Sequence, residues 1–433
     1  MHQTKNVSRR NFFQQMAGSA AAVIAGLSMV ESTFAEVLET IKKLDPPDGE
    51  AWHFDGGYWA KVREQFMLEE GFGYLNNGTL GPTPTPVYEA MVEHWRLMAI
   101  NPHENSQILQ DRQENLRFKA AQFLDVSPDE VAITRNTTEG NTILCHGLDD
   151  LKQGDEILIS AFEHNSCKQT WLREAKRRGY QVKEVSYNNP PNGPDEILNA
   201  FDEAITSRTR IIHIANPTGG YGCIQPVKEL AELAHSKNIL FFIDGAHAPG
   251  MFRFSLREWD VDAFACNAHK WLCGPAGSGL LYVRQNLQDR IWPNISILAR
   301  NPGGARKYSY SVGRRPWPAV AALSNTLDFH LAIGRERTER RLRALGSYLR
   351  EEAAKIAKVE VYTSNDPKLS AGISRIGIEG VSGRKLAQYL RQRYDVYIPG
   401  GSTSVRFSSN YYNTFEQVDR VLQGLKELAL GAA

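Results

Sequence analysis

A lysine and an aspartate follow two neighbouring apolar runs of the chain. Asp244 comes directly after residues 239–243, and Lys270 comes shortly after residues 263–265. Both runs, and a third at residues 280–283, have the length and composition of buried strands, with glycines and polar residues gathered at their carboxyl ends. Ligands of α/β proteins bind at the carboxyl ends of strands. The spacing therefore predicts that an amine and a carboxylate end adjacent strands of one sheet.

This pair of side chains has a specific chemical use. A buried lysine can lose its proton and form a Schiff base with an aldehyde. A buried aspartate can keep a pyridinium nitrogen protonated, so that the ring accepts electrons. Together, Lys270 and Asp244 predict a site for pyridoxal 5′-phosphate (PLP). A salt bridge between two strand ends is the alternative for the pair taken alone.

Other polar residues also stand where a predicted strand ends. The stretch Thr137-Thr138-Glu139-Gly140 lies between a strand and a helix, where hydroxyl and backbone N–H groups can bind a phosphate. The same residues could form an ordinary helix cap. Glu163-His164 follows the predicted strand 156–160, and Asn216 follows the predicted strand 210–215.

The phrases around the aspartate and the lysine, DGAHAPGM and HKWL, resemble the lysine region of the class V aminotransferase family. This family has fold type I, and its isopenicillin N epimerase branch is the most similar. The resemblance extends from about Tyr74 to about Leu428. It implies a PLP-dependent α/β enzyme with a mostly parallel central sheet and a smaller C-terminal α+β domain. It also implies a homodimer, because relatives complete the phosphate site from the partner subunit.

The resemblance implies a role for each matching residue. Lys270 would hold the cofactor and act as the general base, Asp244 would hold the ring nitrogen, and His164 would stack on the ring and relay protons. Arg406 would bind the substrate α-carboxylate through a bidentate fork, and Asn77 would lie in the substrate-side loop. A surface arginine and a plain turn are the alternatives for these two. The other implied cofactor contacts are Thr137, Thr138, Asn267 and His269 at the phosphate, and Asn216 and His247 near the ring hydroxyl.

The sequence departs from the family pattern at two places. Cysteine desulfurases carry a cysteine in the loop before the arginine, but residues 398–404 contain none, and no cysteine lies beyond Cys273. A desulfurase that uses its own cysteine is therefore disfavoured. Where relatives lend a Gly-Thr pair to the partner's phosphate, this chain has Gly313-Arg314. We expect Arg314 to bind that phosphate, with Arg315 as an equally near candidate.

Composition limits the class of partner. The 433 residues include 50 basic and 49 acidic side chains, so the chain lacks the excess of basic residues that is typical of nucleic-acid-binding proteins. An amino acid or peptide is the expected substrate. Five cysteines cannot all pair with one another, and none has a metal-ligand spacing. We expect neither a disulfide framework nor a metal site.

The N-terminus resembles an export signal. Ser8-Arg9-Arg10-Asn11-Phe12-Phe13 matches the twin-arginine pattern, and a small-residue apolar run at 17–30 leads to Thr33-Phe34-Ala35, an acceptable cleavage site. The run is shorter than the roughly 20 apolar residues of a membrane span. We therefore expect residues 1–35 to be a removed twin-arginine signal, the mature protein to be periplasmic, and no stable membrane insertion.

The rest of the chain divides into three parts. Residues 36–73 form an N-terminal arm with a helix at 59–69, residues 74–291 a large PLP-binding domain, and residues 292–433 a small C-terminal domain. The predicted helices of the large domain are 86–101, 109–124, 138–148, 166–178, 195–205 and 227–236, and its further strands are 131–134 and 181–185. One long helix is predicted at 318–357, followed by strands at 359–362 and 372–378 and by helices at 383–393 and from 415.

The reaction has several possible outcomes after loss of the α-proton. Epimerase-like chemistry on an amino acid or a peptide amino-acid moiety is preferred. Alternatives are periplasmic tailoring of a secreted peptide, such as transamination or deamination of a siderophore precursor, and a C–S lyase. A non-catalytic binding protein that retains the fold is the alternative from another class.

Overall fold

The computed structural model describes residues 31–44, 55–295, 302–310 and 312–431. The strands of its larger sheet are β2 (Val131–Thr134), β3 (Glu156–Ser160), β4 (Gln181–Val185), β5 (Thr209–Ala215), β6 (Leu240–Asp244), β7 (Ala263–Asn267) and β8 (Gly279–Val283). They lie in the order β2-β8-β7-β6-β5-β3-β4. Only β8 runs against the others in this sheet, so the prediction of a mostly parallel sheet is confirmed. The carboxyl end of β8 consequently lies at the opposite edge from those of β6 and β7.

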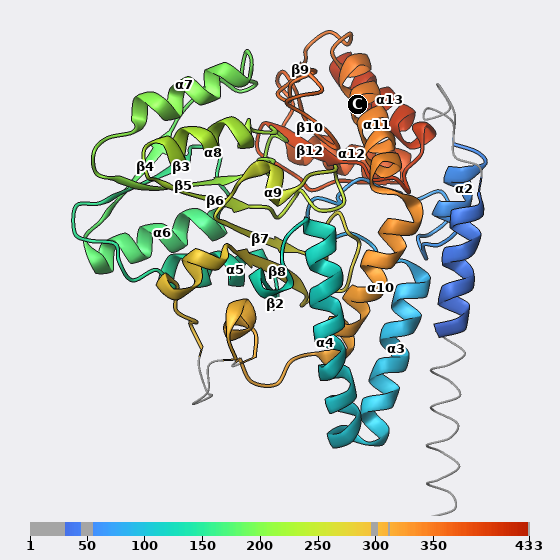
Figure 1. The fold of residues 1–433 in the computed structure, drawn as a ribbon. Coiled ribbons are helices and arrows are strands. Elements are labelled where there is room, and N and C mark those ends of the chain that lie inside the picture. The colour runs from blue at the N-terminus through green and yellow to red at the C-terminus, as the bar shows by residue number, and fades with distance from the viewer. Residues whose placement is uncertain (1–30, 45–54, 296–301, 311, 432–433) are drawn as a thin grey trace, which may run out of the picture.

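Helices cover both faces of this sheet. In Figure 1, α7 (Pro194–Ala204) and α8 (Val227–Ser236) lie above it, and α5 (Thr137–Gly147) and α6 (Asn165–Arg178) lie below it. Ile211 and Ile212, which are neighbours in β5, belong to the two separate cores on these faces. Burial on both faces explains why inner strands such as β6, β7 and β8 are largely apolar. All four helices begin and end within one residue of the predicted bounds.

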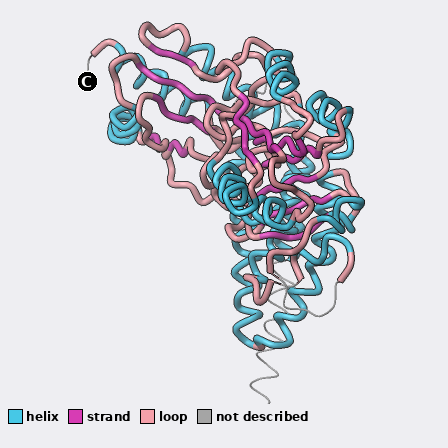
Figure 2. Tube along the Cα trace, turned by 90° about the vertical axis from the view of Figure 1, so that its left-hand side faces the viewer, coloured by secondary structure: helices cyan, strands magenta, loops and turns pink. Residues whose placement is uncertain are grey.

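A layer of three helices extends from the sheet (Figure 1, Figure 2). It consists of α3 (Thr85–Ile100), α4 (Pro102–Leu124) and α10 (Trp317–Ile333), which pack against one another. Helix α4 begins seven residues before the predicted start at 109. The side chain of Asn101 accepts the N–H of Glu104, and Pro102 occupies the first helical position, so the cap rather than the apolar periodicity sets the start.

The C-terminal part has a small sheet covered by helices, as expected. Strands β9 (Val359–Val361), β10 (Ile373–Ile378) and β12 (Ser404–Ser408) pair antiparallel, and α11 (Arg335–Ala353), α12 (Gly383–Tyr394) and α13 (Phe415–Ala429) accompany them. The prediction of one helix at 318–357 is wrong. Helices α10 and α11 are separated at Gly334, whose φ of 96° lies outside the range of a right-handed helix.

Two short strands tie the N-terminal segment to this small domain: β1 (Gly73–Tyr74) pairs in parallel with β11 (Val396–Tyr397). The remaining short elements are α9 (Leu256–Trp259) and the 3₁₀ helices η2 (Pro128–Glu130), η3 (Gln285–Arg290) and η4 (Gly304–Tyr308). The segment that precedes Asn77 is thereby fixed to the small domain.

The N-terminal arm packs on the protein. A helix covers residues 31–43, and α2 (Tyr58–Arg63) ends six residues before the predicted end at 69. Phe34 and Ile41 are buried in one cluster with Trp59. The twin-arginine motif at residues 8–13 lies outside the described residues, whereas the predicted cleavage site 33–35 lies in the first helix. No helix of the described chain combines the length and the hydropathy needed to cross a bilayer.

Candidate active site

The ends of β6 and β7 bring the aspartate and the lysine together. Strand β6 pairs in parallel with β7, and Asp244, the last residue of β6, is the register partner of Ala265. Lys270 lies in the turn that follows β7. The prediction that an amine and a carboxylate end adjacent strands is thus confirmed, and burial makes their charges matter more than they would in water.

Lys270 contacts a histidine whose tautomer is fixed from the other side. The Nζ atom of Lys270 lies 3.1 Å from Nε2 of His247, and the indole N–H of Trp271 donates to Nδ1 of His247 at 3.0 Å. Because Nδ1 accepts, the ring proton of neutral His247 resides on Nε2 and faces the amine. Burial, followed by the charge of Lys270, lowers the pKa of His247 well below its usual value. His247 is therefore a neutral donor.

Burial also favours a neutral lysine. It lowers the pKa of Lys270 from 10.5 to about 8, although the charge of Asp244 acts in the opposite direction. Gly219 leaves room for this arrangement, because a Cβ atom there would lie only 2.7 Å from Nε2 of His247. An amine that loses its proton near neutral pH is suited to act as a base.

Asp244 is held by a residue that the sequence did not reveal. Its Oδ2 accepts from Nδ2 of Asn141 at 2.7 Å, and its Oδ1 accepts from the N–H of Ala246 at 3.1 Å. Asn141 lies in α5, four residues after Thr137, and so on the same face of the helix. That spacing was a usable signal, because Thr137 was already a candidate. The two bonds fix the carboxylate at the carboxyl edge of the sheet.

The predicted phosphate cradle lies at the start of α5. Asn136 caps this helix, so Thr137 and Thr138 occupy its first turn and are not the cap. Thr137 is buried, and its Oγ1 accepts from Nδ2 of Asn267 at 2.9 Å, while Thr138 is exposed. The second N–H of Asn267 donates to the carbonyl of Ala246. Asn267 thus supports Thr137, and its direct contact with the phosphate stays a prediction.

Several buried polar atoms of the described residues lack a protein partner, and among them are nitrogens of two predicted cofactor contacts. They are Nδ1 of His269 and Nδ2 of Asn216, whose Oδ1 accepts from the N–H of Gln225. Burial lowers the pKa of His269 to about 4, so this ring is neutral and offers one N–H. An unpaired buried donor costs about 1–3 kcal/mol unless a ligand satisfies it. With the helix terminus and Lys270, these donors fit the phosphate and the ring hydroxyl of PLP.

His164 stands at the start of α6. Its Nδ1 accepts from the N–H of Ser166 at 3.1 Å, and the residue is only partly covered by the protein. Burial lowers its pKa, the charge of Asp244 raises it, and the charge of Lys270 lowers it again. The three residues predicted as catalytic therefore share one electrostatic environment.

Arg406 reaches this site from β12 of the small domain. Its Nη1 donates to the carbonyl of Gly219 at 2.8 Å, and its Nη2 donates to Oγ1 of Thr79 at 2.7 Å. A Cβ atom at Gly78 would lie 3.2 Å from Cζ of Arg406, so a glycine allows the close approach. Burial, followed by the charge of Arg375, lowers the pKa of Arg406 to about 10. Thr79 and Gly219 were not among the predicted site residues, although Thr79 lies in the predicted substrate-side loop, two residues after Asn77.

Asn77 makes its polar contacts within the protein. It is fully buried, its Nδ2 donates to the carbonyl of Lys270 at 3.3 Å, and its Oδ1 accepts from the hydroxyl of Tyr412 at 3.1 Å. It holds the turn that carries Lys270, whereas the sequence predicted a substrate contact. Of the two arginine candidates, Arg315 is buried and donates to the carbonyl of Ile133, while Arg314 remains exposed.

The cysteines offer no reactive thiol. All five, Cys145, Cys167, Cys223, Cys266 and Cys273, are free and buried. Burial raises the pKa of each, to about 12 for the last three. The expectation that they form no disulfide framework is confirmed, and none is placed as a sulfur acceptor.

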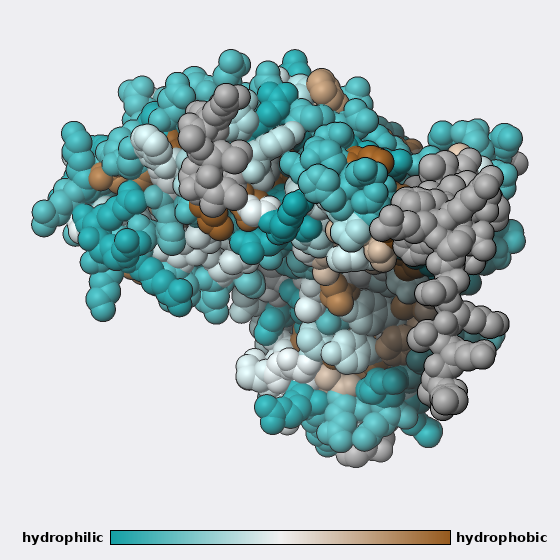
Figure 3. All heavy atoms as spheres, turned by 90° about the horizontal axis from the view of Figure 1, so that it is seen from below, coloured by the Kyte–Doolittle hydropathy of each residue, from teal (hydrophilic) through white to brown (hydrophobic). Residues whose placement is uncertain are grey.

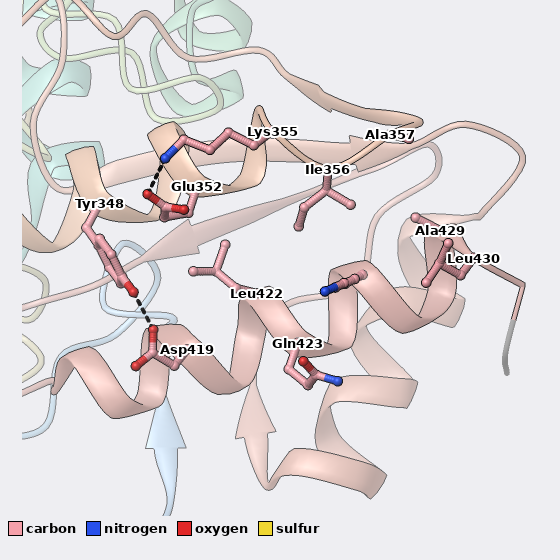
Figure 4. Close-up of a pocket in the computed structure, with 11 residues that line it drawn as sticks. Tyr348, Glu352, Lys355, Ile356, Ala357, Asp419, Leu422, Gln423, Ala429 and Leu430 are labelled. Atoms are coloured by element: carbon pink, nitrogen blue, oxygen red, sulfur yellow. Dashed lines mark hydrogen bonds and ion pairs between the residues drawn. The ribbon is translucent and has the colours of Figure 1, made fainter.

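A separate pocket lies between α11 and α13 (Figure 4). The hydroxyl of Tyr348 donates to Asp419 at 2.6 Å, and Lys355 pairs with Glu352 at 2.6 Å. Its polar side chains thus satisfy one another around an apolar floor that includes Ile356. The residues that could take part in catalysis lie around Lys270 and not in this pocket.

Comparisons with known proteins show the family of the chain. The family model "Aminotransferase class-V" matches residues 73–421. An isopenicillin N epimerase of Amycolatopsis lactamdurans is 29% identical, with 86% of this chain and 98% of that protein covered. A probable cysteine desulfurase of Methanothermobacter thermautotrophicus is 26% identical, over 85% of this chain and 97% of that protein.

Solved structures show the same fold. The apo cysteine desulfurase from Thermococcus onnurineus NA1 superposes with a TM-score of 0.78 at 24% identity, covering 86% of this chain and 98% of that one. The cystine C–S lyase C-DES, in complex with cysteine persulfide, gives 0.76 at 23%, covering 83% and 98%. The match of the family model over most of the sequence decides the assignment. The chain belongs to the class V aminotransferase family and is a PLP-dependent enzyme of fold type I.

Proposed function

We propose that this enzyme removes the proton from the α-carbon of an amino acid, or of an amino-acid moiety in a peptide, and returns it with inverted configuration. The observation that carries the proposal is the buried amine of Lys270, 3.1 Å from the N–H of His247, with a pKa near 8. The likeness to isopenicillin N epimerases supports inversion as the outcome.

The roles of the chain's own residues follow from their positions. PLP, when bound, supplies an electron sink for the charge that develops at the α-carbon. Lys270 takes the α-proton, and the N–H of His247 orients its amine. Asp244, fixed by Asn141, holds the ring nitrogen protonated, and Arg406 binds the α-carboxylate as a planar fork.

The alternatives differ in what leaves the substrate. Transamination or deamination of a secreted peptide, such as a siderophore precursor, is favoured by the twin-arginine motif at residues 8–13. A C–S lyase is favoured by the desulfurase relatives, but a mechanism that needs the chain's own thiolate is disfavoured by its five buried cysteines.

Product analysis separates these outcomes. The holoprotein is incubated with a panel of L-amino acids and short peptides, and the products are resolved by chiral chromatography and mass spectrometry. A D-epimer of unchanged mass supports the proposal. A keto acid, or loss of a β-substituent, would replace it with one of the alternatives. Lys270→Ala provides the control for uncatalysed change.

We also propose a homodimer and export to the periplasm. Exposed apolar side chains gather on α3 and α4, and apolar residues are visible among hydrophilic ones from below (Figure 3). The α3 and α4 residues are Tyr88, Trp95, Ile100, Ile108 and Phe118. Arg314 adjoins this surface, since its Nη1 lies 3.5 Å from Oγ of Ser106 in α4. In the proposed dimer, Arg314 is the residue expected to reach the partner's phosphate.

Export is tested by cell fractionation. Replacing both arginines of the motif, Arg9→Lys and Arg10→Lys, is expected to retain the protein in the cytoplasm. N-terminal sequencing of the periplasmic form is expected to begin at Glu36. Equal periplasmic amounts of the wild type and the double variant would contradict export by this pathway.

A further inference from the structure

Two arginines lie directly opposite each other in the small-domain sheet. In the antiparallel pair formed by β10 and β12, Arg375 is the register partner of Arg406. Side chains of directly opposed residues leave the sheet on the same face, with Cβ atoms about 5 Å apart. Like charges in such a pair are destabilising. The arrangement therefore needs a compensating anion.

The described part of the chain provides no such anion. Neither arginine forms an ion pair with a carboxylate among the described residues. Arg406 donates only to the neutral oxygens of Gly219 and Thr79, and its buried Nε has no partner. Arg375 donates its Nε to Oγ of Ser404 at 2.8 Å, which leaves its terminal nitrogens available. Two guanidinium groups with spare donors thus stand side by side.

Both arginines contact the loop that follows β5. Arg406 donates to the carbonyl of Gly219, and Cζ of Arg375 lies 5.2 Å from the ring centre of Tyr221, two residues further on. The ring of Tyr221 packs edge-on against Phe162, whose centroid lies 5.5 Å away and which precedes His164 by two residues. Arg375 therefore belongs to the wall of the same site.

We infer that the substrate is an amino acid with a second carboxylate, in which Arg406 binds the α-carboxylate and Arg375 binds the carboxylate of the side chain. The inference rests on the proposed function, because it names the substrate class of that site. A carboxylate between two guanidinium groups, or one on each, would remove the repulsion and form charge-assisted hydrogen bonds. The half-buried position of Arg375 reduces competition from water.

Equilibrium binding tests the inference without turnover. Succinate, glutarate and adipate lack the amino group, so the holoprotein can bind them but cannot process them. Their dissociation constants are measured by calorimetry beside those of butyrate, pentanoate and hexanoate. At least one diacid is expected to bind ten or more times tighter than its monoacid. Equal affinities in all three pairs would overturn the inference.

Variants assign the effect to Arg375. Arg375→Gln is expected to abolish most of the advantage of the diacid, and Arg375→Lys to restore part of it, because lysine keeps the charge but not the fork. Arg173→Gln, on the exposed part of α6, is the matched control and should leave the ratio unchanged. If Arg375→Gln weakens diacids and monoacids equally, the residue has only a structural role and the inference fails. Thermal unfolding of each variant checks that it remains folded.

A second measurement separates this inference from the proposed function. Loss of the α-proton is followed for L-glutamate and L-glutamine, which differ at the second carboxylate. A higher kcat/KM for glutamate, reduced by Arg375→Gln, supports the inference. Exchange at equal rates for both would overturn the inference and leave the proposed function intact. If neither amino acid loses its α-proton although a diacid binds tightly, the result counts against the proposed function alone.

Discussion

The amine of Lys270 lies 3.1 Å from Nε2 of His247, a contact that joins the predicted base to a neutral donor. Trp271 completes the chain by donating its indole N–H to Nδ1 of the same histidine. The buried indole of Trp271 thereby determines which nitrogen of His247 carries the proton. Because that proton faces Lys270, the tautomer of His247 also affects how readily Lys270 becomes neutral.

Replacing Trp271 tests this chain of contacts. In Trp271→Phe the ring proton can move to Nδ1, so that the lone pair of Nε2 faces Lys270 and stabilises its ammonium form. Amine-specific labelling of Lys270 in the apoprotein, followed by mass spectrometry, should rise with pH around a midpoint near 8 in the wild type. The midpoint should move to higher pH in Trp271→Phe.

Trp171→Phe is the matched control. Trp171 is also fully buried, and its indole N–H donates to Nδ1 of His213 at 2.9 Å, in a Trp–His pair that does not contact Lys270. Both variants should lose about 2–4 kcal/mol of stability through the cavity they create. Equal labelling midpoints in the two variants would show that Trp271 has only a packing role.

The same shift predicts a pH dependence of stability. Burial disfavours the charged form of Lys270 in the folded protein, so its pKa is about 8 there and 10.5 in the unfolded chain. The unfolded state therefore binds more protons between these values, and the free energy of unfolding rises with pH across that window. Lys270→Met should lack this contribution, which urea unfolding of the apoprotein at pH 7.5 and 9.5 can measure against the wild type. If the free energy of unfolding changes equally between the two pH values in Lys270→Met and in the wild type, the pKa of Lys270 is not lowered in the folded protein.

Asp244→Asn should bind PLP but turn over slowly. The amide keeps the size of the side chain but cannot hold the ring nitrogen protonated by its charge. We expect a loss of about 10²–10³ in kcat, the range of one well-placed electrostatic group. Cofactor content from the visible spectrum separates weak binding from weak catalysis. Turnover close to that of the wild type would mean that the ring does not serve as the electron sink.

Arg406→Lys should weaken substrate recognition while keeping the charge. Lysine cannot present the planar pair of donors that a carboxylate accepts. We expect kcat/KM to fall by about tenfold or more, with PLP content unchanged. An unaltered kcat/KM would place the α-carboxylate elsewhere.

Assembly can be tested at the helical layer. Trp95→Glu places a charge in the exposed apolar surface of α3, and analytical ultracentrifugation should show a shift from dimer to monomer. Glu89→Gln, on the same helix, is the control for a neutral change on an exposed position. A wild-type protein that is monomeric at micromolar concentration and fully active would contradict the dimer.

The sequence predicted the central fold well where local patterns decide it. Strands β2 and β3 are fully buried and mostly apolar, and their bounds agree with the prediction. The errors occur where a single residue overrides a pattern. Gly334 separates α10 from α11 within a continuous helical periodicity, and Asn101 starts α4 well before its first apolar residue.

The candidate site was predictable in its composition but not in its contacts. Lys270 and Asp244 follow their strands, so the topology alone brings them together. The positions of Asn267 and Asn77 follow strand and turn as expected, yet their amides face Thr137 and the backbone of Lys270. Side-chain direction in a turn depends on tertiary packing that no local motif encodes.

Proton exchange at the α-carbon tests the central claim most directly. The holoprotein is incubated in D₂O with L-glutamate, and NMR and chiral chromatography follow deuterium in both enantiomers. We expect α-deuterated D- and L-glutamate both to accumulate with the wild type and neither to form with Lys270→Ala. If L-glutamate and a panel of other amino acids keep their α-protons in a protein with full PLP content, the proposed epimerase-like function is wrong.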